Sequence, residues 1–176
     1  HIPNTLSQKD NLKKTVILWA SNPEPNIHPF TGENGGDSKV ARKIERQLIK
    51  DFGNNSDYKV IFRAHPNEQV NYFQLPNNFR VSPTSEQLAS LVASVDIVLI
   101  TSSTVAIQAL LLNKKVIKIN KSLFKNDIPY EKVKLALSVN ALDQIKTTVE
   151  TINNTKPAQL TLPLGAIENT LKVIYK

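Results

Sequence analysis

The chain has 176 residues, of which 40% are hydrophobic and 21% are charged, a mixture typical of one compact globular domain. Its 22 Lys and Arg outnumber its 15 Asp and Glu, and the net charge of +7 favours anionic partners such as nucleotides, phosphorylated sugars or acidic lipid surfaces. The absence of cysteine excludes disulfides and thiolate chemistry, and the lack of long basic runs and of nucleic-acid-binding motifs leads us to expect no nucleic-acid partner.

Hydrophobic runs alternate with longer amphipathic stretches along the chain, which is typical of βαβ units and a parallel sheet. The apolar runs predict strands at 15–20, 58–64, 79–82, 96–100 and 115–119, and a short sixth strand at 134–139. The amphipathic stretches predict helices at 37–51, 84–95, 103–112 and 141–152, and a closing helix at 164–176. Asn113 is expected to supply the left-handed turn that ends the third of these helices.

This order of elements predicts an α/β fold with a Rossmann-like, doubly wound parallel sheet of five or six strands and helices on both faces. In such sheets a ligand lies outside the carboxyl ends of the strands, near the switch in strand order. We expect an amino-terminal linker at 1–14, the nucleotide-binding domain at 15–155, and a carboxy-terminal loop and helix at 156–176 that pack back on it.

Four consecutive hydroxyl residues, Thr101, Ser102, Ser103 and Thr104, directly follow the strand at 96–100. The N–H groups at a helix start attract an anion, and hydroxyls add further donors. An ordinary helix cap needs only one hydroxyl, so this cluster favours a phosphate site over capping alone. Ser102 and Ser103 are the candidates for direct contact.

A second candidate group is the segment "FRAHPNE", at the end of the second predicted strand. Arg63 and His65 alternate there, so both can point to the same side of the sheet, and Pro66 ends the strand ladder. A histidine in this place can donate a hydrogen bond to phosphate or titrate near neutral pH. The alternative is a histidine whose ring is satisfied by a backbone carbonyl in a turn.

The third candidate is the loop "HPFTGENGGDSK" after the first strand, in which Gly35 and Gly36 allow backbone amides to approach a ligand closely. It matches neither the Walker loop nor the GxGxxG fingerprint, and a flexible turn explains it equally well. The three histidines lack metal-ligand spacing, so the sequence implies no metal and no cofactor.

The segments "RAHPNE" and "SEQLASLVASVDIVLITSSTVAIQALLLNKKVIKI" together resemble the carboxy-terminal, nucleotide-sugar-binding half of a GT-B glycosyltransferase. The resemblance covers roughly 15–152, and the His-Pro pair is similar to that of bacterial capsule, teichoic-acid and sialic-acid transferases. It implies that Ser102 and Ser103 bind the donor's pyrophosphate and that His65 contacts the nucleotide phosphate. It also places Gln108 where that family has a ribose-binding Glu, and this departure puts the identity of the donor in doubt.

Two alternatives remain open. The segments "GENGGD" and "HPNEQV" are similar to those of UDP-N-acetylglucosamine 2-epimerases, although the arginines of the epimerase motif are missing and Glu68 replaces its proline. A non-catalytic nucleotide-binding domain is the other alternative, and Gln108 is the feature that favours it.

The resemblance implies a donor-binding domain for bacterial surface polysaccharide synthesis, with a nucleotide-sugar or a CDP/CMP donor as substrate. The implied partners are an amino-terminal half domain, which the missing initiator methionine suggests lies elsewhere in a longer protein, and a glycolipid or peripheral membrane acceptor. The implied location is the cytoplasm, at the inner face of the membrane. On its own this segment is expected to be inactive, because the general base and the acceptor pocket lie mainly on the other half.

Overall fold

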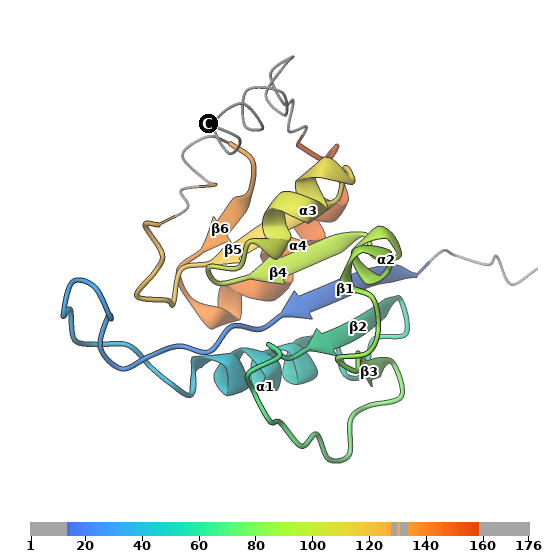
Figure 1. The fold of residues 1–176 in the computed structure, drawn as a ribbon. Helices are drawn as coiled ribbons and strands as arrows, with labels where there is room; N and C mark the ends of the chain where they lie inside the picture. Colours follow the sequence, from blue (N-terminus) through green and yellow to red (C-terminus); the bar gives the residue numbers. More distant parts are fainter. Residues whose placement is uncertain (1–13, 128–129, 131–133, 159–176) are drawn as a thin grey trace, which may run out of the picture.

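A computed structural model describes residues 14–127, 130 and 134–158. In this part of the chain the sheet is parallel throughout and has six strands in the order β3-β2-β1-β4-β5-β6 (Figure 1). The strands are β1 Thr15–Ala20, β2 Tyr58–Arg63, β3 Phe79–Val81, β4 Ile97–Ile100, β5 Lys115–Ile119 and β6 Leu137–Val139. The predicted Rossmann-like fold is therefore confirmed, including the short sixth strand.

The helices cover both faces of this sheet, as expected for a doubly wound fold (Figure 1). They are α1 Val40–Phe52, α2 Leu88–Ala93, α3 Val105–Leu111 and α4 Ile145–Asn153, with a 3-10 turn, η1 Leu142–Gln144, before α4. Residues of α1 and α4 share one buried apolar cluster, and residues of α2 and α3 share the other.

The central strands are apolar without interruption because both of their faces are buried. In β4, Ile97 and Leu99 point to the α1 and α4 side, whereas Val98 and Ile100 point to the α2 and α3 side. All four side chains are completely excluded from solvent. This alternation fixes the register of the strand, since a slip by one residue would exchange the two faces.

The helix boundaries differ from the predicted ones where local turns compete with the helix. α2 begins at Leu88 because the preceding residues form a turn closed by the hydrogen bond from the Glu86 amide to the Pro83 carbonyl, at 2.9 Å. Asn113 ends the α3 segment with a φ of 54°, as the sequence predicted. The predicted closing helix at 164–176 and all of the predicted linker except Lys14 lie outside the described residues, so the domain boundaries stay predictions.

Candidate functional site

A cavity of about 320 Å³ opens at the carboxyl ends of β1, β2 and β4. The strand order switches direction at this place. From β1 the chain adds β2 and β3 on one side of the sheet, and it then returns to add β4 and β5 on the other side of β1. Its lining residues are Ala20, Ser21, Asn22, Arg63, Ala64, His65, Pro66, Leu88, Ser102, Ser103, Thr104 and Val105. Segments far apart in the sequence thus meet where an α/β sheet normally binds its ligand.

The hydroxyl cluster divides into residues with different surroundings. Ser102 is half-buried and lines the cavity, and its hydroxyl oxygen accepts a hydrogen bond from the side-chain amide of Asn22 at 3.5 Å. Ser103 lines it too, but its hydroxyl oxygen accepts the Val105 N–H at 3.2 Å, so it also caps the start of α3. Thr104 is exposed at the rim of the cavity. Thr101 is buried away from it, and its hydroxyl has no hydrogen-bond partner among the described residues.

His65 belongs to a tight turn that sets the state of its ring. The backbone N–H of Glu68 donates to the His65 carbonyl at 2.8 Å, and the backbone N–H of Asn67 donates to His65 Nδ1 at 3.2 Å. Because Nδ1 is an acceptor, the proton of the neutral ring is on Nε2. The ring is thus bonded within a turn, but to a backbone N–H and not to the carbonyl that the alternative interpretation expected, and the other nitrogen remains a donor in a residue that lines the cavity.

Arg63 also lines the cavity, but its guanidinium is bound elsewhere. Nη1 donates to the Ser82 hydroxyl at 2.8 Å and to the Pro83 carbonyl, and Nη2 donates to the Thr84 carbonyl at 3.1 Å. These bonds hold the β3–α2 loop against the end of β2. The structure therefore explains Arg63 as a tether, and its predicted phosphate contact stays a prediction.

The glycine loop and Gln108 do not line the cavity. The amides of Gly35 and Gly36 both donate to the Asn26 carbonyl, at 3.2 and 3.0 Å, so they close the loop and do not point to a ligand. A Cβ on Gly36 would lie 1.8 Å from the Pro25 carbonyl oxygen, which explains this glycine by close packing. Gln108 is exposed on α3. The structure thus favours the turn interpretation of the loop, and the predicted ligand contacts of these three residues remain untested.

Three residues near the cavity were missed by the sequence analysis: Ser21, Asn22 and Glu68. Ser21 donates its hydroxyl to Glu68 Oε2 at 2.7 Å, and the same oxygen accepts the His65 N–H at 3.2 Å. Ser21 and Asn22 directly follow β1, so their position after a strand was a signal that could have identified them. The contact between Glu68 and Ser21 joins the segments that follow two different strands, so no local pattern in the sequence reveals it.

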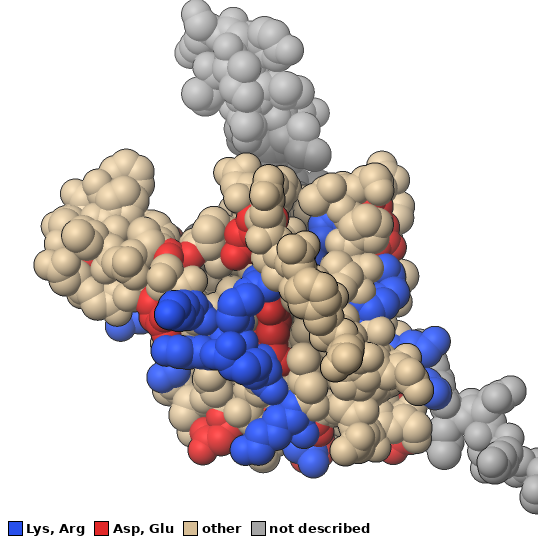
Figure 2. Space-filling model, turned by 90° about the horizontal axis from the view of Figure 1, so that it is seen from below, with Lys and Arg blue, Asp and Glu red and all other residues tan. Residues whose placement is uncertain are grey.

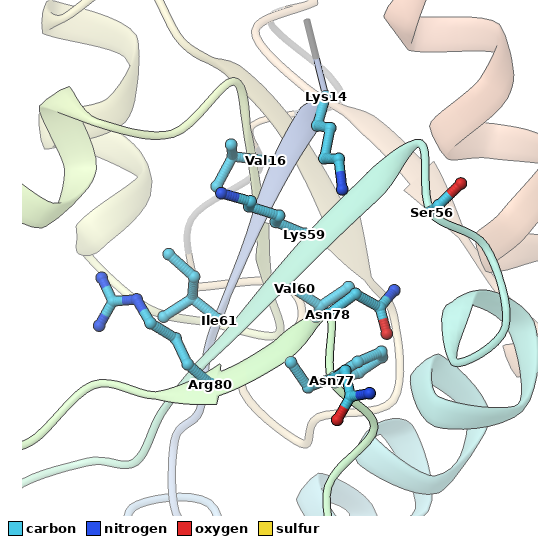
Figure 3. Close-up of a pocket in the computed structure, with 10 residues that line it drawn as sticks. Lys14, Val16, Ser56, Lys59, Val60, Ile61, Asn77, Asn78 and Arg80 are labelled. Carbon is cyan, nitrogen blue, oxygen red and sulfur yellow. The ribbon is translucent and has the colours of Figure 1, made fainter.

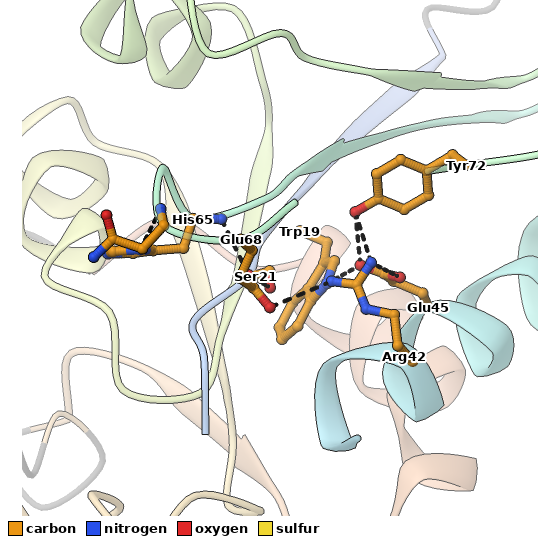
Figure 4. Close-up of polar contacts among 8 residues, drawn as sticks. Trp19, Ser21, Arg42, Glu45, His65, Glu68 and Tyr72 are labelled. Carbon is orange, nitrogen blue, oxygen red and sulfur yellow. Dashed lines mark hydrogen bonds and ion pairs between the residues drawn. The ribbon is translucent and has the colours of Figure 1, made fainter. Parts of the chain in front are cut away.

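Behind Glu68, a partly buried group of polar side chains connects α1 with the sheet (Figure 4). Glu45 pairs with Arg42 at 2.8 Å and accepts hydrogen bonds from Trp19 Nε1 at 3.3 Å and from the Tyr72 hydroxyl at 3.0 Å. Burial raises the pKa of Glu45, and the Arg42 charge opposes that shift. Burial, together with the nearby Glu45 charge, raises the pKa of Tyr72 to about 12.

A larger cavity, of about 440 Å³, lies at the opposite, amino-terminal end of the strands (Figure 3). Lys14, Lys59 and Arg80 surround an apolar floor that includes Val16 and Ile61. Arg80 is bound by both oxygens of Glu86, at 2.8 and 3.0 Å, which lowers the pKa of Glu86 to about 2. Parallel α/β sheets bind their ligands at the carboxyl ends of their strands, so we take the smaller cavity as the candidate site.

The basic charge of the chain does not by itself locate the site. Lys and Arg side chains gather on the face that is seen from below, where α1 lies, and α1 contributes the exposed Lys43, Arg46 and Lys50 (Figure 2). In the described part of the chain, no three His, Asp or Glu side chains form a group that could hold a metal ion. No helix among the described residues is both long and apolar enough to cross a bilayer.

No family model matches the sequence, and no curated protein is similar to it. The fold is nevertheless similar to part of solved glycosyltransferases and of a UDP-GlcNAc 2-epimerase, which confirms the resemblance to one half of a GT-B protein at the level of fold.

Three solved structures illustrate this likeness. The Methanocaldococcus jannaschii UDP-GlcNAc 2-epimerase, solved with UDP-GlcNAc and UDP, matches 94% of this chain at 13% identity with a TM-score of 0.61. The kitacinnamycin glycotransferase matches 88% at 12% identity and the calicheamicin glycosyltransferase 84% at 14% identity, both with TM-scores of 0.59. The chain spans 46%, 40% and 36% of the lengths of these three proteins, respectively. Their activities are therefore carried over to this chain only as a proposal.

Proposed function

We propose that this chain is the donor-binding half of a glycosyltransferase of bacterial surface polysaccharide assembly, and that its carboxyl-end cavity holds the phosphates of a nucleotide-activated sugar or a CDP/CMP donor. The observation that carries the proposal is the convergence of His65, Ser102 and Ser103 on one cavity at the switch in strand order. Their side chains supply hydrogen-bond donors in a cavity that is open to water.

In this proposal the cavity stabilises the leaving nucleotide. As the glycosidic bond breaks, negative charge grows on the phosphate oxygen, and donors that are already oriented lower the energy of that charge. His65 contributes the N–H of Nε2, Ser102 its hydroxyl, and Asn22 its side-chain amide. The general base and the acceptor pocket belong to a second half domain, and the acceptor is a glycolipid at the inner face of the membrane. The isolated chain therefore binds donor but turns over little.

Calorimetric titration with UDP, CDP and CMP tests this function. We expect binding of at least one nucleotide, and about a 10-fold loss of affinity in both His65→Ala and Ser102→Ala, because each removes a hydrogen bond to a charged group. Ser90→Ala is the matched control, since Ser90 is exposed on α2 and its hydroxyl bonds only to the Gln87 side chain among the described residues. The absence of binding to all three nucleotides, or equal affinity in every variant, contradicts the proposal.

The second candidate is an epimerase, which is favoured by the 94% coverage of this chain in its match to the UDP-GlcNAc 2-epimerase. Both enzymes predict nucleotide binding in the same cavity. They differ in turnover: an epimerase isomerises a free UDP-sugar without an acceptor, whereas a transferase needs one. Incubation of the protein that contains this chain with UDP-GlcNAc alone, followed by separation of the sugar epimers, decides between them. A non-catalytic nucleotide-binding domain gives binding and neither reaction.

A further inference from the structure

The segment His65-Pro66-Asn67-Glu68 forms a turn whose backbone bonds all concern the histidine. The Glu68 amide closes the turn on the His65 carbonyl, and the Asn67 amide bonds to the ring at Nδ1. Pro66 occupies the second position, where its fixed φ suits a β-turn. The turn thereby determines which ring nitrogen carries the proton, but these bonds within the turn do not fix its position relative to the sheet.

The side chain of Glu68 provides that connection. Its Oε2 accepts both the His65 N–H and the Ser21 hydroxyl, so one carboxylate oxygen joins the start of the turn to the end of β1. Its Oε1 lies 3.7 Å from Nη2 of Arg42, and Arg42 is held by Glu45 and by the Tyr72 hydroxyl at 3.1 Å. Figure 4 shows Glu68 between the histidine and this group on α1.

We propose that Glu68 is a positioning residue, which holds the His65 turn against β1 so that the Nε2 proton faces the anion in the cavity. This inference rests on the proposed function of that cavity. Ser21 and His65 both line it, so a carboxylate that binds both residues sets the distance between two of its walls. Glu68 itself does not line the cavity and does not touch the ligand; it acts through His65.

The β2–β3 connection, which contains the His65 turn, is also anchored by contacts that do not involve Glu68. The protein should therefore still fold when the carboxylate is removed, so the proposal can be tested. Tyr72 binds Arg42 and Glu45, and the Asn78 side chain donates to the carbonyls of Phe52, Asn55 and Tyr58 at 2.8 to 3.2 Å. The β2–β3 connection therefore keeps several contacts with α1 and β2 when the carboxylate is removed.

A double-mutant cycle on the 176-residue chain, with UDP as the probe, tests whether Glu68 acts through His65. We expect Glu68→Ala to lower UDP affinity about 5-fold when His65 is present and by less than about 2-fold in a His65→Ala background. Glu68→Gln keeps an oxygen that can accept both bonds and should restore most of the affinity. Glu150→Ala removes an exposed carboxylate of α4 and should change nothing. Equal losses in the two backgrounds, or no loss in either, overturn the positioning role.

The ¹⁵N resonances of the His65 ring give a second measurement that needs no nucleotide. We expect an unprotonated, hydrogen-bonded Nδ1 in the neutral ring of the wild type and of Glu150→Ala, and altered ring resonances in Glu68→Ala. Identical ring resonances in Glu68→Ala and wild type refute the inference. If the wild-type chain binds none of UDP, CDP and CMP, the proposed function fails, while the ring resonances still decide whether Glu68 fixes the histidine.

Discussion

The two ends of the sheet carry two cavities with different chemistry. The amino-end cavity is the larger, at about 440 Å³ against 320 Å³, and it has charged side chains around an apolar floor. The carboxyl-end cavity has hydroxyls, an amide and an imidazole from the segments after β1, β2 and β4, and Arg63, the one cation among its described lining residues, is bound to the β3–α2 loop. We place the proposed site by the convergence of hydrogen-bond donors at the switch in strand order, and not by the size of the cavity or the number of its cations.

A negative charge placed in each cavity tests this distinction most strongly. Ser102→Asp introduces a carboxylate beside the expected phosphate, and we predict that UDP affinity falls by about 100-fold or more, because like charges in contact cost several kcal/mol. Ser56→Asp places the same charge at the amino-end cavity and should change affinity by less than about 2-fold. Calorimetry measures both. A larger loss in Ser56→Asp than in Ser102→Asp moves the anion site to the opposite end of the sheet.

The glycines near the two ends provide a comparison of stability. In Gly36→Ala the new Cβ meets the Pro25 carbonyl oxygen at 1.8 Å, so the backbone must shift, and we expect unfolding to become easier by about 1 to 3 kcal/mol. In Gly53→Ala the closest contact is 2.5 Å, to the Ile49 carbonyl oxygen, so the overlap is less severe and the net cost should be smaller. Urea denaturation gives both free energies. A greater loss in Gly53→Ala shows that the loop after β1 is less tightly packed than the structure indicates.

Much of the fold could be predicted from the sequence because the strands are short, continuous apolar runs with turns between them. The hydroxyls after β4 were found for the same reason, since they directly follow such a run. Asn22 and Ser102 are 80 residues apart, so their contact depends on the pairing of β1 with β4 and leaves no local signal. The guanidinium bonds of Arg63 to the β3–α2 loop were missed for a similar reason.

Glu86, in the β3–α2 loop, should stabilise the fold above acidic pH. Its folded-state pKa is about 2, mainly because Arg80 binds it, and its ordinary value is 4.5. A depressed pKa contributes stability above pH 4.5, and that contribution is lost as the pH falls toward 2. The pair is largely solvated, so we expect less than about 1 kcal/mol. The free energy of unfolding of Glu86→Gln relative to wild type, measured between pH 2 and 6, tests this; a pH-independent difference refutes it.

Glu45, behind the carboxyl-end cavity, should show the opposite slope. Burial raises its pKa above 4.5, so the folded state binds this proton more tightly than the unfolded state does. The associated stability is present below pH 4.5 and is lost as the pH rises through the folded-state pKa. We expect wild type to lose stability relative to Glu45→Gln over that rise. Denaturation curves of both proteins across this range report the sign, and the reverse sign means that Arg42 outweighs burial.

The most direct test of the central claim is a UDP titration of the ¹⁵N-labelled chain followed by amide chemical shifts. The carboxyl-end site predicts that the largest amide shift changes fall at residues 21–22, 63–65 and 102–105, and that the amide shifts of residues 56–61 and 77–80 at the amino-end cavity do not change. Changes confined to the amino-end residues would contradict it, as would the absence of any change with millimolar UDP, CDP and CMP, each tested in turn.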